Sequence, residues 1–137
     1  MSGFWQPLLG TELRSYRELL VWQKSMDLSV NVFEMTRNFP TEEKFGITAQ
    51  LRRSVTSISA NIAEGQARRT TGEFVQSLAM ARGSLAEVET FLLLSERLGH
   101  APSPECKSLL AGCQEVNKML NGLIKSVSQR KSQGSGL

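Results

Sequence analysis

Basic residues gather between residues 44 and 72 of this 137-residue chain. The stretch holds a single acidic residue, Glu64, against five basic ones: Lys44, Arg52, Arg53, Arg68 and Arg69. Clustered ammonium and guanidinium groups attract phosphate oxygens, so this segment is a candidate nucleic-acid contact. Arg68 and Arg69 are the better placed, because the loop expected after a helix exposes its side chains. An ordinary solvated face would explain the same charges.

A polar stripe runs along the same segment. Five polar residues recur at spacings of three or four and share one helix face: Gln50, Arg53, Ser57, Asn61 and Glu64. Two interpretations stay open. The stripe is either a hydrogen-bonded contact with another helix or subunit, or a surface whose arginine meets phosphate. Arg53 and Glu64 lie too far apart to pair with each other, so each is expected to pair with a neighbouring helix.

Residue types that support catalysis or metal binding are scarce. His100 is the single histidine and follows Gly99 in an expected loop, where a histidine is usually solvated. Cys106 and Cys113 would lie about 10 Å apart on a helix, too far for a disulfide. The sequence contains neither zinc-ligand spacing nor a glycine-rich phosphate loop. It therefore predicts no enzymatic activity, no metal and no cofactor.

Apolar residues at helical spacing predict four helices, over residues 18–39, 42–64, 71–98 and from Ser103 onward. Thr41 and Thr70 are expected N-caps, and Gly65 is expected to end the second helix in the left-handed conformation. The short connections predict an all-α, antiparallel up-down-up-down four-helix bundle. This bundle should span residues 16–131, after an N-terminal extension over 1–15 and before a disordered tail over 132–137.

The expected core consists of one apolar stripe from each helix. In chain order the stripes are Val21, Leu28, Val32, Met35 and Phe39; Ile47, Leu51, Val55, Ile58 and Ile62; Phe74, Leu78, Ala81, Leu85, Val88 and Leu92; and Leu109, Cys113, Val116, Leu120, Leu123 and Val127.

Two helices carry more apolar surface than a four-helix bundle can bury. Residues 71–98 are apolar nearly all round, and residues 18–39 have a second stripe with Trp22, Met26 and Phe33. This excess predicts a homo-oligomer. No run of about 18 apolar residues predicts a membrane span, and no secretory signal is apparent. With two unpaired cysteines, these features favour the cytoplasm.

Four segments resemble the four-helix-bundle family of 23S ribosomal RNA intervening-sequence proteins, which are encoded within bacterial ribosomal RNA genes or as free-standing genes. They are residues 20–25, 39–54, 59–68 and 81–90, with the sequences LVWQKS, FPTEEKFGITAQLRRS, SANIAEGQAR and ARGSLAEVET. Together they fall within residues 16–100. The family pattern does not explain the N-terminal segment with Phe4 and Trp5.

The resemblance implies a ring-like homopentamer. The accessory variability determinants of diversity-generating retroelements look like relatives, which implies a basic barrel that binds a reverse transcriptase and RNA. Nucleic-acid contacts are expected from Arg52, Arg53, Arg68, Arg69 and Lys24. Structural or subunit contacts are expected from Trp22, Gln50, Asn61, Glu64, Arg82 and Glu89. The alternative function is a protein-binding adaptor, for example an accessory subunit of a reverse transcriptase.

Overall fold

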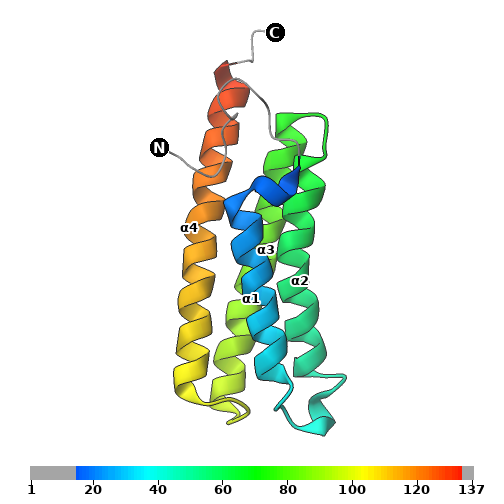
Figure 1. The fold of residues 1–137 in the computed structure, drawn as a ribbon, viewed down its shortest axis with the longest axis vertical. Coiled ribbons are helices and arrows are strands. Elements are labelled where there is room, and N and C mark those ends of the chain that lie inside the picture. Colours follow the sequence, from blue (N-terminus) through cyan, green and yellow to red (C-terminus); the bar gives the residue numbers. More distant parts are fainter. Residues whose placement is uncertain (1–14, 134–137) are drawn as a thin grey trace.

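The computed structural model describes residues 15–133, which form four long helices. They are α1 (Leu20–Thr36), α2 (Ile47–Gln66), α3 (Thr71–Arg97) and α4 (Ser103–Gln133). Two short 3-10 helices, η1 (Tyr16–Glu18) and η2 (Thr41–Glu43), precede α1 and α2. Successive long helices run in opposite directions (Figure 1). The predicted all-α, up-down-up-down four-helix bundle is therefore confirmed.

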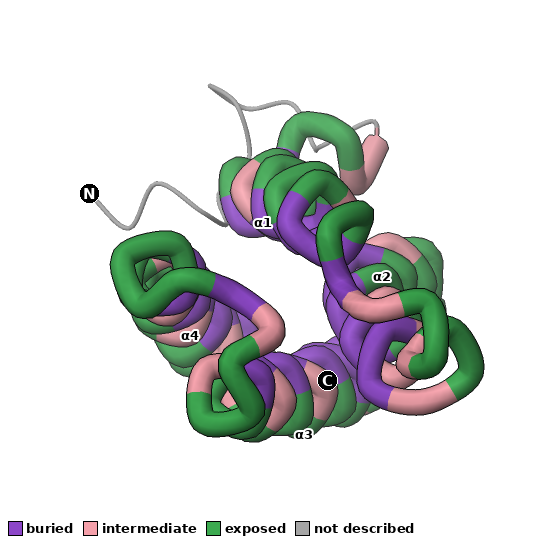
Figure 2. Tube along the Cα trace, turned by 90° about the horizontal axis from the view of Figure 1, so that it is seen from below, coloured by how far each residue is buried: buried purple, intermediate pink, exposed green. Residues whose placement is uncertain are grey.

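The core lies along the axis that the four helices surround. Every residue of the four predicted apolar stripes is buried. Viewed along the axis, the buried positions face inward from all four helices, and α1 lies between α2 and α4 (Figure 2). No helix within residues 15–133 is both long and apolar enough to cross a bilayer.

The helix ends were predicted with mixed success. Thr70 caps α3 as predicted, since its Oγ1 accepts a hydrogen bond from the Glu73 amide at 3.1 Å. The prediction that Thr41 is the N-cap of the second helix was wrong. Residues 41–43 form η2, and Gly46 breaks the helical conformation with φ −104° and ψ −119°. The Glu43 carboxylate then accepts the first amide of α2, from Ile47, at 3.4 Å.

The predicted end of the second helix was also wrong, because Gly65 lies inside α2 and is buried. A Cβ atom at this position would stand 2.6 Å from Ser77 Cβ and 3.0 Å from Phe74 Cδ1. The glycine is thus required by the close approach of α2 to α3. The left-handed glycine of the described chain is Gly99, with φ 73°, between α3 and α4.

The predicted chain ends fall partly outside the described residues. Residues 1–14 of the expected extension and residues 134–137 of the expected tail belong to this undescribed part. Ser15 caps η1 by accepting the Arg17 amide at 3.1 Å. Residues 132–133 continue α4, so the expected disorder is wrong there.

Candidate nucleic-acid interface

Arg52 is held in a fixed position between α1 and α2. Its Nε donates to Thr36 Oγ1 at 2.9 Å, and its Nη2 donates to the Phe33 carbonyl at 3.5 Å. The guanidinium carbon lies 4.8 Å from the centre of the Phe33 ring, within range of a cation–π interaction. Arg52 therefore joins the two helices, and it covers part of the second apolar stripe predicted on α1.

The polar stripe of α2 faces α3. Ser57 Oγ donates to Ser84 Oγ at 2.6 Å, which requires the two backbones to lie close together. Arg53 Nη2 donates to Gln50 Oε1 at 2.5 Å and lies 3.6 Å from Glu87 Oε2 on α3. At these positions the stripe therefore makes a contact between α2 and α3. Asn61 Nδ2 donates within α2, to the Ser57 carbonyl.

Glu64 does not reach a neighbouring helix, contrary to the prediction. Its carboxylate pairs at 3.2 Å with Arg68, which follows one turn later. Arg68 and Arg69 are exposed in the connection between α2 and α3, as the sequence predicted. Arg68 also shares a shallow cleft with a second carboxylate, Glu73. Arg69 has no ionic or hydrogen-bonded partner among the described residues, so its guanidinium is the freer of the two.

The remaining predicted residues also have partners inside the bundle. Lys24 Nζ lies 3.7 Å from Glu115 Oε1 and bridges α1 to α4. Arg82 Nη1 donates to Asn121 Oδ1 at 2.9 Å and bridges α3 to α4. Trp22 packs edge-on against the Tyr16 ring of η1, with 5.2 Å between the ring centres. Lys24 and Arg82 therefore connect helices as well as carrying charge.

Glu89 lies on α3, half-buried, where its charge acts on Cys113. Burial and then this carboxylate raise the pKa of the Cys113 thiol to about 12. Burial, followed by the charges of Glu96 and Glu105, raises the pKa of Cys106. Both cysteines are free and buried, in line with the prediction that they form no disulfide.

The prediction that His100 is a solvated loop residue was wrong, because its side chain is largely buried. Its Nε2 lies 3.0 Å from Glu43 Oε2, and its ring packs against Phe39 at 5.6 Å between centres. The side chain is largely buried and joins the α3–α4 loop to η2. The local sequence contains no signal for this contact, because Glu43 comes from a distant part of the chain.

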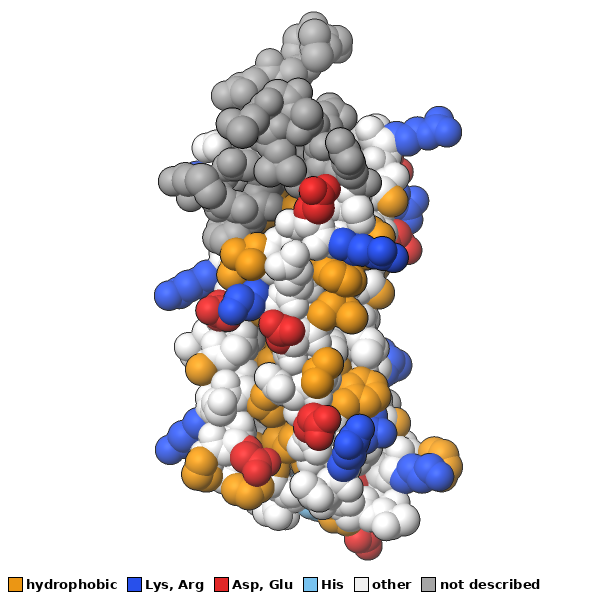
Figure 3. Space-filling view, viewed as in Figure 1, with side chains coloured by type: hydrophobic (Ala, Val, Ile, Leu, Met, Phe, Trp, Pro, Cys, Tyr) orange, Lys and Arg blue, Asp and Glu red, His pale blue; other side chains and the backbone are white. Residues whose placement is uncertain are grey.

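Apolar side chains remain on the outer faces of α1 and α3. Met26 and Val30 of α1 are exposed, and Trp22 and Phe33 beside them are half-buried. On α3 the exposed apolar side chains include Met80, Leu93 and Leu94. In the face shown in Figure 3, apolar side chains run down the molecule over α1 and beside α2. The excess apolar surface predicted for these helices is therefore present on the single chain.

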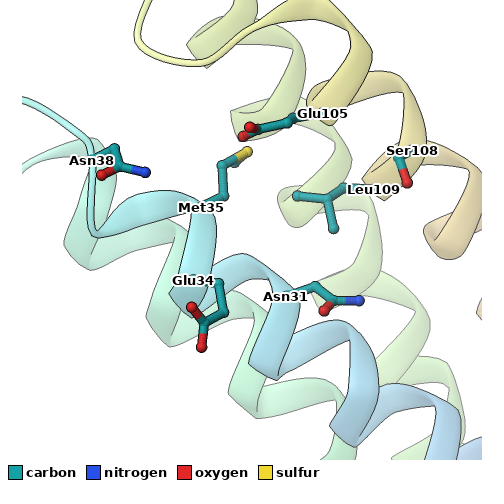
Figure 4. Close-up of a pocket in the computed structure, with 7 residues that line it drawn as sticks. All are labelled: Asn31, Glu34, Met35, Asn38, Glu105, Ser108 and Leu109. Carbon is teal, nitrogen blue, oxygen red and sulfur yellow. The ribbon is translucent and has the colours of Figure 1, made fainter.

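A cleft of about 460 Å³ opens between α1 and α4 (Figure 4). Its lining residues are Asn31, Glu34, Met35, Asn38, Glu105, Ser108 and Leu109. This set offers carboxylates, carboxamides and one hydroxyl but no basic group, so it is unsuited to phosphate. The described residues contain no group of three histidine, cysteine or acidic side chains that could hold a metal ion.

The fold and the surface define an antiparallel four-helix bundle. Polar and ionic contacts join its neighbouring helices, and the outer faces of α1 and α3 expose apolar side chains. Residues 17–122 match the family described as 23S rRNA-intervening sequence protein. The chain belongs to this family. Comparison with curated proteins gives no match.

A solved structure from Bacteroides thetaiotaomicron is similar to this chain. It is the crystal structure of a protein of unknown function from the S23 ribosomal protein family. The two are 30% identical, with a TM-score of 0.72 over 77% of this chain and 96% of the other.

Proposed function

We propose that the protein is a non-enzymatic subunit of a homo-oligomer, with five copies as the leading number, that binds nucleic acid, RNA foremost. The observation that carries the proposal is the apolar surface on α1 and α3, which the four-helix core leaves exposed. Covering such surface with further copies of the chain is favourable, because it removes apolar area from water. Closed rotational symmetry is the usual outcome for identical subunits.

Nucleic-acid binding draws its support from charge and from the family. One chain has a net charge of +3, which is too little for strong phosphate binding. Five copies around an axis would repeat every basic position, including the exposed Arg68 and Arg69. The description of the family refers to 23S rRNA, which makes RNA the first ligand to test.

A protein-binding adaptor is the second candidate. Lys24, Arg53, Arg68 and Arg82 all pair within the bundle, and that pairing favours this alternative. A reverse transcriptase could occupy the same apolar faces of α1 and α3. Under this alternative the purified chain would bind no nucleic acid by itself.

Light scattering on purified protein tests the oligomer. The chain mass is 15.2 kDa, and we expect about five times that mass in solution. Leu94→Glu would place a charge on the exposed face of α3 and should lower the mass to that of the monomer. Gln114→Glu is the matched control, since it adds the same charge at an exposed polar position of α4. A monomeric wild type would refute the oligomer.

A further inference from the structure

A basic cleft of about 360 Å³ lies where α1 leads into α2. Its lining residues are Thr36, Arg37, Phe39, Pro40, Thr41, Lys44, Thr48 and Arg52. Three of them are cations, and none of these described lining residues is acidic. Basic side chains also gather at the lower right of the face in Figure 3, over this end of α1 and α2. The charge of the cleft suits an anionic group.

Arg52 is already oriented for such a group. Its contacts with Thr36 and Phe33 use two of the five N–H donors of its guanidinium. The Phe33 ring lies against the guanidinium, with 4.8 Å between the ring centre and the guanidinium carbon, and the other donors stay available. A ligand would therefore meet an arginine that loses little conformational freedom on binding.

Thr48 supplies an independent sign of a missing partner. The residue is only 8% exposed, and its Oγ1 is buried with no hydrogen-bond partner among the described residues. A buried hydroxyl normally finds a partner, so an unpaired one marks a site where a ligand oxygen can complete the bonding. Thr48 precedes Arg52 by one helical turn, which puts both on the same face of α2.

The nearby carboxylates leave the cleft positive. Glu43 is directed to His100 and to the start of α2. Glu34 pairs with Arg37 at 3.6 Å, but both side chains are well exposed. An exposed pair is weak, so a phosphate can compete for the arginine. Glu42 is exposed on η2 and is not among the lining residues.

An exposed aromatic residue directly follows the cleft residue Lys44 in the chain. Phe45 is 87% exposed, the highest value among the exposed large apolar side chains described. The ammonium of Lys44, a cleft residue, lies 5.5 Å from the centre of the Phe45 ring. A basic groove next to an exposed aromatic ring is the usual arrangement for single-stranded nucleic acid, since every base can stack on such a ring.

We infer that this cleft binds a backbone phosphate of single-stranded nucleic acid while the adjoining base stacks on Phe45. Arg37, Lys44 and Arg52 hold the phosphate, and Thr48 donates its free hydroxyl to the same ligand. The inference rests on the nucleic-acid part of the proposed function and gives it a location. Arg68 and Arg69 lie at the opposite end of α2, so the two basic regions can be tested separately.

The test measures binding of the full chain to fluorescent oligouridine and oligothymidine of about 12 nucleotides at low salt. Arg37→Ala with Lys44→Ala should weaken binding and reduce the slope of log affinity against log salt by about 0.7 for each phosphate that is no longer neutralised. Lys107→Ala with Lys118→Ala is the matched control, because it removes two exposed cations from α4. The control should retain the wild-type slope to within half of that change.

Substitutions at Phe45 separate stacking from simple apolar contact. Phe45→Leu should weaken binding by about tenfold, whereas Phe45→Trp should retain it, because only the aromatic side chain stacks on a base. Light scattering on both variants should give the wild-type mass. A changed mass would show that Phe45 contacts another subunit, which overturns the inference.

Each remaining outcome either supports or overturns the inference. Weakened binding in the cleft variants, for either oligonucleotide, supports the inference. Undiminished binding in those variants overturns it, while the nucleic-acid part of the proposed function stands. Absence of wild-type binding to both oligonucleotides at low salt, or binding of inorganic phosphate alone, overturns the inference. The nucleic-acid part of the proposed function falls as well only when structured RNA and duplex DNA also fail to bind.

Discussion

Glycine positions in α2 and α3 differ in what a methyl group would meet. At Gly65 a Cβ would stand 2.6 Å from Ser77 Cβ, closer than real Cβ atoms approach one another. At Gly83, on the exposed face of α3, a Cβ would meet nothing within 4 Å. The two residues are both helical glycines, so their helix propensities match while their surroundings do not.

Gly65→Ala should therefore destabilise the bundle, by about 1–3 kcal/mol, because α2 and α3 must separate to admit the methyl group. Gly83→Ala should stabilise it by about 0.5–1 kcal/mol, since alanine loses less backbone entropy in a helix. Urea unfolding of both variants measures the two free energies. A stabilising Gly65→Ala would contradict the close packing of α2 against α3.

The raised pKa of the buried Cys113 thiol predicts that the folded protein loses stability at high pH. Its pKa rises from 9.0 to about 12 on folding, so the folded chain retains the thiol proton where the unfolded chain releases it. This contribution is complete below pH 9.0 and disappears as the pH rises from 9.0 to about 12. The loss should reach at most about 1.4 kcal/mol per pH unit.

Urea unfolding at about pH 8 and about pH 10.5 should show a steeper decline for wild type than for Cys113→Ala, which lacks the thiol. Equal declines for the two proteins would mean that the buried thiol does not contribute.

Neighbouring arginines of α2 have different roles in joining the helices. Arg52 is half-buried and bonded to Thr36 and Phe33 of α1. Arg53 bridges to Glu87 of α3, but its side chain is 62% exposed and that of Glu87 is 48% exposed. Water therefore screens the second contact far more than the first.

Arg52→Ala should lower the free energy of unfolding by about 1.5–3 kcal/mol, the range for hydrogen bonds to charged groups. Arg53→Ala should cost no more than about 1 kcal/mol. The two variants are matched in chemistry and adjacent in sequence, so thermal and urea unfolding compare their surroundings directly. A larger destabilisation for Arg53→Ala would indicate that a second subunit buries it in the oligomer.

At the scale of the whole molecule, the two ends of α2 carry separate basic regions. Arg69 is unpaired among the described residues, and Arg68 is held by Glu64. In a ring these positions would recur in every subunit. Phosphate contacts made there would be insensitive to sequence, because they involve no base edge.

Changing Arg68 and Arg69 together to alanine should lower the slope of log affinity against log salt, by about 0.7 to 0.9 for each phosphate released. The bundle should keep its thermal stability, since both residues lie in an exposed turn. Structured RNA and duplex DNA are the ligands to titrate. An unchanged slope would exclude this end of the bundle from nucleic-acid binding.

Hydrophobic period by itself determined the architecture of this protein. Every residue of the predicted core stripes is buried, because a helix with apolar residues at spacings of three and four must cover that face. The Thr70 cap was equally predictable, since both partners lie within one turn. Local contacts of this kind can be predicted from the sequence, because the residues that make them are close together in the chain.

Only the tertiary structure decided which polar residues pair. The contacts of Arg52 with Thr36, Arg53 with Glu87 and His100 with Glu43 join distant parts of the chain. Gly65 was predicted to end a helix, yet its role depends on how near α3 approaches. The cleft between Arg37, Lys44 and Arg52 likewise exists only once α1 and α2 pack. Such geometry follows from the relative positions of helices, which periodicity within a single helix does not specify.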